Sequence, residues 1–162
     1  MLVRQPHVAG SFYPADPQEL KAQLASLIHP GFRKEGFVRA VIVPHAGNIY
    51  SGKTAGAVWS AVGVPDRVLA IGPNHYGVGA KIAVLNDGLW RTPLGDLIID
   101  RELAAEFAAK KTGLKPDEKA HANEHSLEVV FPFLKFLNPS VKILPILIRD
   151  WSVEEMDVFA GK

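Results

Sequence analysis

The sequence contains no cysteine, which excludes a disulfide, a thiolate metal ligand and a thiol nucleophile within its 162 residues. It also has almost no excess of charge, since 18 Lys and Arg stand against 17 Asp and Glu. The basic side chains are scattered along the chain rather than grouped in a stripe. This pattern argues against a nucleic-acid-binding protein and against binding to an anionic membrane.

Long hydrophobic runs are missing as well. No uninterrupted apolar segment approaches the ~18 residues that a membrane-spanning helix needs. Residues 1–14, MLVRQPHVAGSFYP, have no hydrophobic region of a secretory signal. We therefore expect a cytoplasmic protein, and we expect residues 1–162 to form one domain with its own hydrophobic core.

What the sequence does contain is an alternation of short apolar runs with helical patterns. We predict strands at residues 39–44, 67–72, 81–85, 97–99 and 141–148, with residues 90–95 as a loop. We predict helices after Asp16, over 54–59, after Asp100, over 124–137 and after Ser152. Strands 39–44 and 67–72, with a helix between them, form a predicted βαβ unit. The class is α/β, with a largely parallel or mixed central sheet flanked by helices.

Two histidines follow directly after predicted strands. His45 ends the run VRAVIVPH, and His75 follows RVLAIGPN. In an open parallel sheet, ligands bind outside the carboxyl ends of the strands, where both side chains would lie. Two imidazoles there could bind a divalent metal, transfer a proton or hold an anion, or each could simply form a hydrogen bond to its own loop.

A second group of titratable residues lies in the segment HANEHSLEVVFPFL. His121, Glu124 and His125 match the H-x-x-E-H pattern, in which two histidines four residues apart on one helix bind zinc. The pattern is short, and Asn123 indicates a helix that begins after His121. The alternative is that Glu124 caps this helix while Glu128 lies on a solvated face. Pro132 predicts a kink or a late start of the helix.

Five segments, taken in this order and spacing, resemble the Memo family, whose bacterial and archaeal members are called AmmeMemoRadiSam system protein B. These segments are HVAGSFYPADPQEL, PHAGNIYSG, GPNHYG, WRTPLGDL and EHSLEVVFPFL. The resemblance covers essentially the whole chain. It implies a fold like that of the class III extradiol dioxygenases, non-haem iron enzymes built on an α/β sheet with helices on both sides.

The resemblance implies that His45 and His75 are metal ligands and that the metal is Fe or Cu. In the dioxygenases a carboxylate completes the ligand set, and in Memo proteins a cysteine takes that place. Family members are longer than this chain, and the part with no counterpart here carries that cysteine. We therefore expect a chain that lacks its C-terminal portion and whose two histidines hold a metal weakly.

The resemblance also implies the residues of a pocket around the metal. His125 corresponds to a histidine that lines the substrate pocket of the dioxygenases, and Glu124 precedes it. Phe12 matches an aromatic position in the pocket wall. Asn48 and Tyr50 belong to the motif that follows the first histidine, and Asn48 stands where the family usually has Tyr. In the animal protein this pocket has been proposed to bind a phosphotyrosine peptide.

Three functions follow as expectations. The first is a Memo-like oxidoreductase of unknown substrate, with an incomplete catalytic set in this chain. The second is a non-catalytic binding module that uses the same pocket for an anionic or phosphorylated partner, and the third is a scaffold without a site. Family gene context implies a radical SAM protein and an AMMECR-type domain protein as partners. If the missing portion contributes strands to the sheet, this chain exposes a sheet edge without them. We then expect the chain to self-associate.

Overall fold

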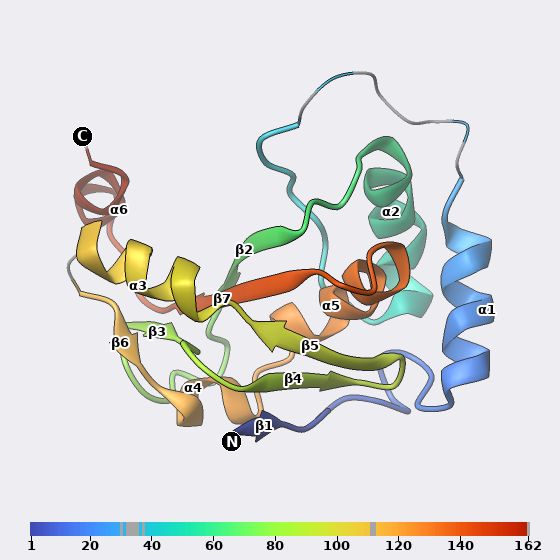
Figure 1. Ribbon diagram of the computed structural model, residues 1–162, viewed down its shortest axis with the longest axis horizontal. Coiled ribbons are helices and arrows are strands. Elements are labelled where there is room, and N and C mark those ends of the chain that lie inside the picture. The colour runs from blue at the N-terminus through green and yellow to red at the C-terminus, as the bar shows by residue number, and fades with distance from the viewer. Residues whose placement is uncertain (30, 32–35, 37, 111–112, 162) are drawn as a thin grey trace.

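The computed structural model of the chain describes residues 1–29, 31, 36, 38–110 and 113–161. Within these residues a single mixed β-sheet is flanked by helices, which confirms the predicted α/β class (Figure 1). The strands are β1 (Val3–Arg4), β2 (Arg67–Pro73), β3 (Ile82–Val84), β4 (Leu89–Thr92), β5 (Gly95–Ile99), β6 (Lys115–Pro116) and β7 (Lys142–Ile148). The helices are α1 (Pro17–Leu27), α2 (Asn48–Ala61), α3 (Arg101–Lys110), α4 (Glu118–Ala122), α5 (Ser126–Leu137) and α6 (Val153–Ala160).

Strand β7 is the centre of the sheet. One of its edges pairs in parallel with β2 along its whole length, and the other edge pairs in parallel with β5 and antiparallel with β3. Ile143 and Leu147 point into the core that α5 covers, whereas Leu144 and Ile146 pack on the opposite face with α3. Because both faces are buried, the strand reads as a continuous apolar run, as the sequence predicted.

Helix α5 connects the sheet to the helices beside it. It packs on β2 and β4, and α1 and α2 pack against it in turn, so that these three helices lie together (Figure 1). The predicted helix starts after Asp16 and Ser152 are confirmed, since both side chains accept backbone N–H groups of the first turn. Asp100 does the same for α3, through the N–H of Leu103. No helix among the described residues is long and apolar enough to cross a membrane.

The predicted strand at residues 39–44 is wrong. The structure assigns no strand there, and the βαβ unit with residues 67–72 is absent, since β2 pairs with β7 instead. Ile42 is 95% exposed, so the apolar run is not buried as a central strand would be. An apolar run indicates that a segment can pair in a sheet, but the pairing itself depends on which edge lies beside it.

The predicted loop at residues 90–95 is also wrong. These residues belong to the antiparallel hairpin β4–β5, in which Thr92 pairs with Gly95 across a two-residue turn. The Thr92 hydroxyl donates to the Gly95 carbonyl at 2.7 Å and closes the turn, and Gly95 adopts a positive φ of 113°. Pro93 and Gly95 indicated a loop, but they are the residues of a tight turn inside a hairpin.

Candidate metal centre

His45 and His75 lie side by side, with ring centroids 5.2 Å apart. His45 ends the segment that leads into α2, and His75 follows the end of β2. A third imidazole, that of His125, stacks on the His75 ring with centroids 4.5 Å apart. Three histidines from distant parts of the sequence therefore share one site, which the positions of the first two had indicated.

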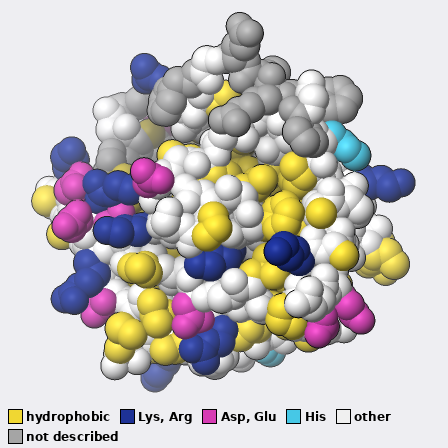
Figure 2. Space-filling view, turned by 45° about the vertical axis from the view of Figure 1, so that its right-hand side comes forward, with side chains coloured by type: hydrophobic (Ala, Val, Ile, Leu, Met, Phe, Trp, Pro, Cys, Tyr) yellow, Lys and Arg dark blue, Asp and Glu magenta, His cyan; other side chains and the backbone are white. Residues whose placement is uncertain are grey.

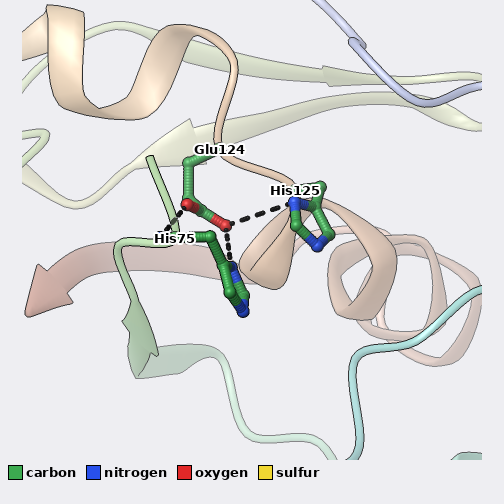
Figure 3. Close-up of side chains that lie close together, drawn as sticks. All are labelled: His75, Glu124 and His125. Carbon is green, nitrogen blue, oxygen red and sulfur yellow. Dashed lines mark hydrogen bonds and ion pairs between the residues drawn. The ribbon is translucent and has the colours of Figure 1, made fainter. Parts of the chain in front are cut away.

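Glu124 holds the His75 ring in place. Its Oε1 lies 2.8 Å from His75 Nδ1, and its Oε2 accepts the backbone N–H of His75 at 2.6 Å (Figure 3). Oε1 also accepts the N–H of Ser126 at 2.8 Å. A carboxylate on Nδ1 makes that nitrogen the protonated one, so the other nitrogen, Nε2, keeps a lone pair for a ligand.

The electrostatics of the cluster favour neutral imidazoles at His45 and His125 and an ionised carboxylate at Glu124. Burial lowers the pKa of His45, and the neighbouring His75 and His125 lower it further. Burial likewise lowers the pKa of His125, although Glu124 opposes the effect. Burial alone would raise the pKa of Glu124, but the hydrogen bonds from His75 and Ser126 outweigh it and keep that pKa below its usual value. Neutral imidazole is the form that binds a metal.

The end of β2 approaches the start of α5 closely because residue 72 is glycine. A Cβ on Gly72 would lie 2.8 Å from Ser126 Oγ and 2.9 Å from a methyl group of Leu127. The Ser126 hydroxyl donates to the carbonyl of Pro73 at 3.0 Å and fixes this approach. The contact places the segment with Glu124 against the loop that carries His75.

Phe12 forms an aromatic contact with the cluster. Its ring meets that of His125 edge-on, with centroids 5.2 Å apart. The Phe12 carbonyl accepts the N–H of Asn48 at 2.7 Å, and a Cβ on Gly47 would come within 3.3 Å of the same oxygen. The sequence did not single out Tyr76, whose ring lies 6.1 Å from that of His125. Its place directly after His75 was the only signal for it.

The side chains of the other two predicted pocket residues face other surroundings. The Asn48 side chain is buried and donates to Gln23 on α1 at 2.7 Å. Tyr50 is 85% exposed on α2. Among the ring contacts of the described residues, none joins Tyr50 to a histidine. Of the seven predicted site residues, His45, His75, Phe12, Glu124 and His125 are the ones brought together.

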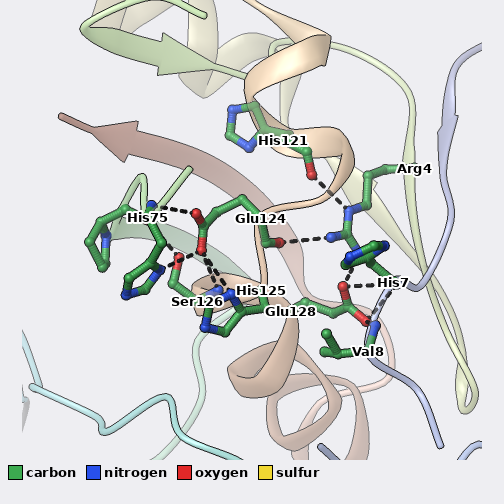
Figure 4. Close-up of polar contacts among 10 residues, drawn as sticks. Arg4, His7, Val8, His75, His121, Glu124, His125, Ser126 and Glu128 are labelled. Carbon is green, nitrogen blue, oxygen red and sulfur yellow. Dashed lines mark hydrogen bonds and ion pairs between the residues drawn. The ribbon is translucent and has the colours of Figure 1, made fainter. Parts of the chain in front are cut away.

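The expected solvated position of Glu128 is wrong, because this carboxylate is 1% exposed. It accepts the backbone N–H groups of His7 and Val8, and it forms an ion pair of 2.6 Å with Arg4 (Figure 4). It also accepts a hydrogen bond from the Tyr13 hydroxyl at 2.7 Å. Burial and the neighbouring Glu128 raise the pKa of Tyr13. Sequence reasoning missed this network. All its partners lie more than a hundred residues from Glu128: His7, Val8 and Tyr13 belong to the conspicuous HVAGSFYP segment, and Arg4 shortly precedes it.

The H-x-x-E-H interpretation fails, since His121 and His125 do not share a helix. Helix α4 ends at Ala122, Asn123 caps it, and α5 begins at Ser126. The His121 side chain is fully buried beside Trp90, and burial lowers its pKa to about 4. Among the described residues, one group of three side chains has ligand atoms close enough to hold a metal, His75, Glu124 and His125, and neither His121 nor His45 belongs to it.

Known proteins match the chain along most of its length. A family model described as "Memo-like protein" matches residues 4–162. A MEMO1 family protein of Archaeoglobus fulgidus is 46% identical over 146 residues, which cover 90% of this chain and 54% of the relative. One of Aquifex aeolicus is 46% identical over 151 residues, covering 91% and 55%, and one of Nitrosopumilus maritimus is 40% identical over 163 residues, covering 94% and 59%. The chain therefore spans between 54% and 59% of the length of these three relatives.

Proposed function

The chain belongs to the Memo-like protein family, and on this premise we propose that it carries part of a pocket for a non-haem metal, Fe or Cu, with His45 and His75 as ligands. The observation that carries the proposal is the meeting of these two rings, 5.2 Å apart, from separate segments of the chain. Imidazole suits both metals.

The orientation of His75 supports the proposal. A metal-binding histidine commonly donates its other ring N–H to a carboxylate, which fixes the tautomer and the direction of the ring. Glu124 Oε1, 2.8 Å from His75 Nδ1, is such a carboxylate. In this arrangement Nε2 of His75 is the atom that would bind the metal.

A second set of ligands is conceivable, because donor atoms of His75, Glu124 and His125 all lie within 4.8 Å of one another. Glu124, however, is 1% exposed and accepts three N–H groups, which already hold its carboxylate against His75 and Ser126. We therefore assign to Glu124 the orientation of His75. His125, stacked on His75 and edge-on to Phe12, forms the wall of the pocket.

The chain spans little more than half of the length of its relatives, so the activity proposed next is that of the whole family protein. A bound Fe or Cu with open coordination positions would supply redox chemistry. Glu124 would orient His75, and Phe12 and His125 would position a substrate beside the metal. The proposed class is an oxidoreductase whose substrate is unknown.

The test is the affinity of the chain for Fe(II), without oxygen, and for Cu(II), measured by calorimetry. We expect one site per chain, loss of at least tenfold in affinity in both His45→Ala and His75→Ala, and unchanged binding in His29→Ala. His29 is an exposed histidine beyond α1 and outside the cluster. Equal, weak binding in all four proteins would overturn the metal assignment and favour the same pocket as a site for an anionic partner.

A further inference from the structure

Strand β2 has one paired edge and one unpaired edge. It pairs with β7 from Arg67 to Pro73, and no described residue pairs with its other side. The burial of the two strands reflects this difference. Ile143 and Ile146 of β7 are fully buried, whereas Ile71 of β2 is 50% exposed. An unpaired edge of seven residues next to the central strand of a sheet is a template for another strand.

The backbone groups of this edge can be assigned from the pairing with β7. Asn74 N donates to Ile148 O, and the carbonyl of Asp66 accepts from the first residue of β7. Since backbone polar groups alternate between the two edges of a strand, even-numbered residues of β2 face β7. The N–H and C=O groups of Leu69 and Ile71 therefore point to the unpaired edge.

An apolar groove lies along this edge. It has a volume of about 470 Å³ and runs between β2 and residues 38–45, which pass between β2 and α2 in Figure 1. Leu127, Val130 and Leu134 of α5 are among the residues that line it. Figure 2 shows hydrophobic side chains exposed on a face of the molecule, between charged ones. Exposed apolar surface of this kind marks a site of interaction.

The relatives are longer than this chain, so they have further sequence that is available to fill the groove. The three compared above extend well beyond the matched region, since this chain spans no more than 59% of their length. We infer that an extended apolar stretch of that remaining family sequence enters the groove as a strand and pairs with Leu69 and Ile71 of β2. The inference does not depend on metal binding.

The same insertion accounts for the apolar run at residues 39–44. Val41 and Val43 line the groove from the side opposite to β2. A strand between them and β2 would cover this run and would provide the partner that it lacks among the described residues. It would also end beside His45, which lines the same groove.

The experiment is to produce this chain together with the part of the Aquifex aeolicus relative that it does not match. Amide hydrogen exchange, followed by NMR, is compared for the complex and for the chain alone. We expect a 1:1 complex in which exchange at Leu69 and Ile71 slows at least tenfold. The N–H of Ala70, which faces β7, should be protected in both samples.

A matched pair of variants tests the edge directly. Ile71→Pro removes the N–H that points into the groove without removing a bond to β7, whereas Ile71→Ala keeps that N–H and removes only the side chain. We expect the complex to weaken roughly tenfold more in Ile71→Pro than in Ile71→Ala. Equal thermal unfolding of the two variants without the partner segment shows that the proline itself does not unfold the chain.

Three results would overturn the inference. One is the absence of a complex, and another is a complex in which exchange at Leu69 and Ile71 is unchanged. The third is a dimer of the chain alone with both amides protected, because a second copy would then fill the groove. Loss of metal binding, with the complex and its exchange pattern intact, would overturn the proposed function and leave this inference standing.

Discussion

Glu124 contacts His75 twice, through a ring nitrogen 2.8 Å from one carboxylate oxygen and through the backbone N–H, 2.6 Å from the other. The position and the tautomer of His75 are thus fixed by the protein itself. The Glu124 carboxylate is buried and held below its usual pKa, so it remains ionised at neutral pH. A ring oriented in this way can bind a ligand without first losing rotational freedom.

Replacing Glu124 with Gln should weaken metal binding without abolishing it. An amide has one acceptor oxygen in place of two, so one of the N–H groups that Glu124 now accepts loses its partner. Loss of such an orienting group typically costs 10–100-fold in metal affinity. Calorimetry with Cu(II) measures the change, and Glu102→Gln, on the exposed surface of α3, is the control. Complete loss of binding would make Glu124 a ligand rather than an orienting residue.

The close approach of β2 to α5 predicts that Gly72→Ala destabilises the fold. The added methyl group would lie within 3 Å of Ser126 and Leu127, so α5 must move away. Overpacking of this kind costs about 1–3 kcal/mol, measured as the free energy of unfolding in urea. Gly31→Ala is the matched control, because a Cβ there meets no atom within 4 Å. Equal stability of the two variants would contradict the packing described here.

The buried ion pair predicts a larger effect for Glu128→Gln. The substitution keeps the shape of the side chain and removes the charge that compensates Arg4, whose side chain is 3% exposed. Breaking a buried pair by neutralising one partner costs about 3–5 kcal/mol. Chemical denaturation measures the loss, and Glu106→Gln, on the exposed side of α3, should stay within about 0.5 kcal/mol of the original protein. A small effect at Glu128 would mean that the network contributes little to stability.

His121 predicts a dependence of stability on pH. Its pKa in the folded protein is about 4, against an ordinary value of 6.5, because burial disfavours the charged ring. The unfolded chain therefore binds this proton first as the pH falls. The contribution of His121 to the free energy of unfolding is complete above pH 6.5 and declines between pH 6.5 and 4. The total loss amounts to about 3 kcal/mol.

The variant His121→Leu isolates this contribution. Its free energy of unfolding should fall less between pH 7 and 4 than that of the original protein. The prediction would be contradicted if the free energies of unfolding of His121→Leu and of the original protein changed equally with pH. The His121 ring would then bind its proton equally well in the folded and in the unfolded chain.

Local patterns predicted much of this fold. The Asp16 and Ser152 caps and the apolar run of β7 depend on residues close in sequence, and all three are confirmed. Residues 39–44 have the same apolar character as a strand, but their place in the sheet depends on a pairing edge. Among the described residues, the free edge of β2 does not pair with residues 39–44, so this run forms no strand.

The site was predictable where the position along a strand carried the signal. His75 follows strand β2, as expected. His45 lies beside it, although the strand that was predicted to precede His45 is absent. Glu124 could be named as a candidate, but its bond to His75 spans 49 residues. Glu128 was misplaced because its charge indicated solvent, and only the fold brings Arg4 to it. Long-range polar partners of this kind leave no periodic pattern in the sequence.

The most direct test of the central claim is the electron paramagnetic resonance spectrum of one equivalent of Cu(II) bound to the chain, with histidine labelled by ¹⁵N. We expect coupling to two imidazole nitrogens in the original protein, to one in His45→Ala and in His75→Ala, and to two in His125→Ala. Coupling that is unchanged when His45 or His75 is replaced would contradict this claim.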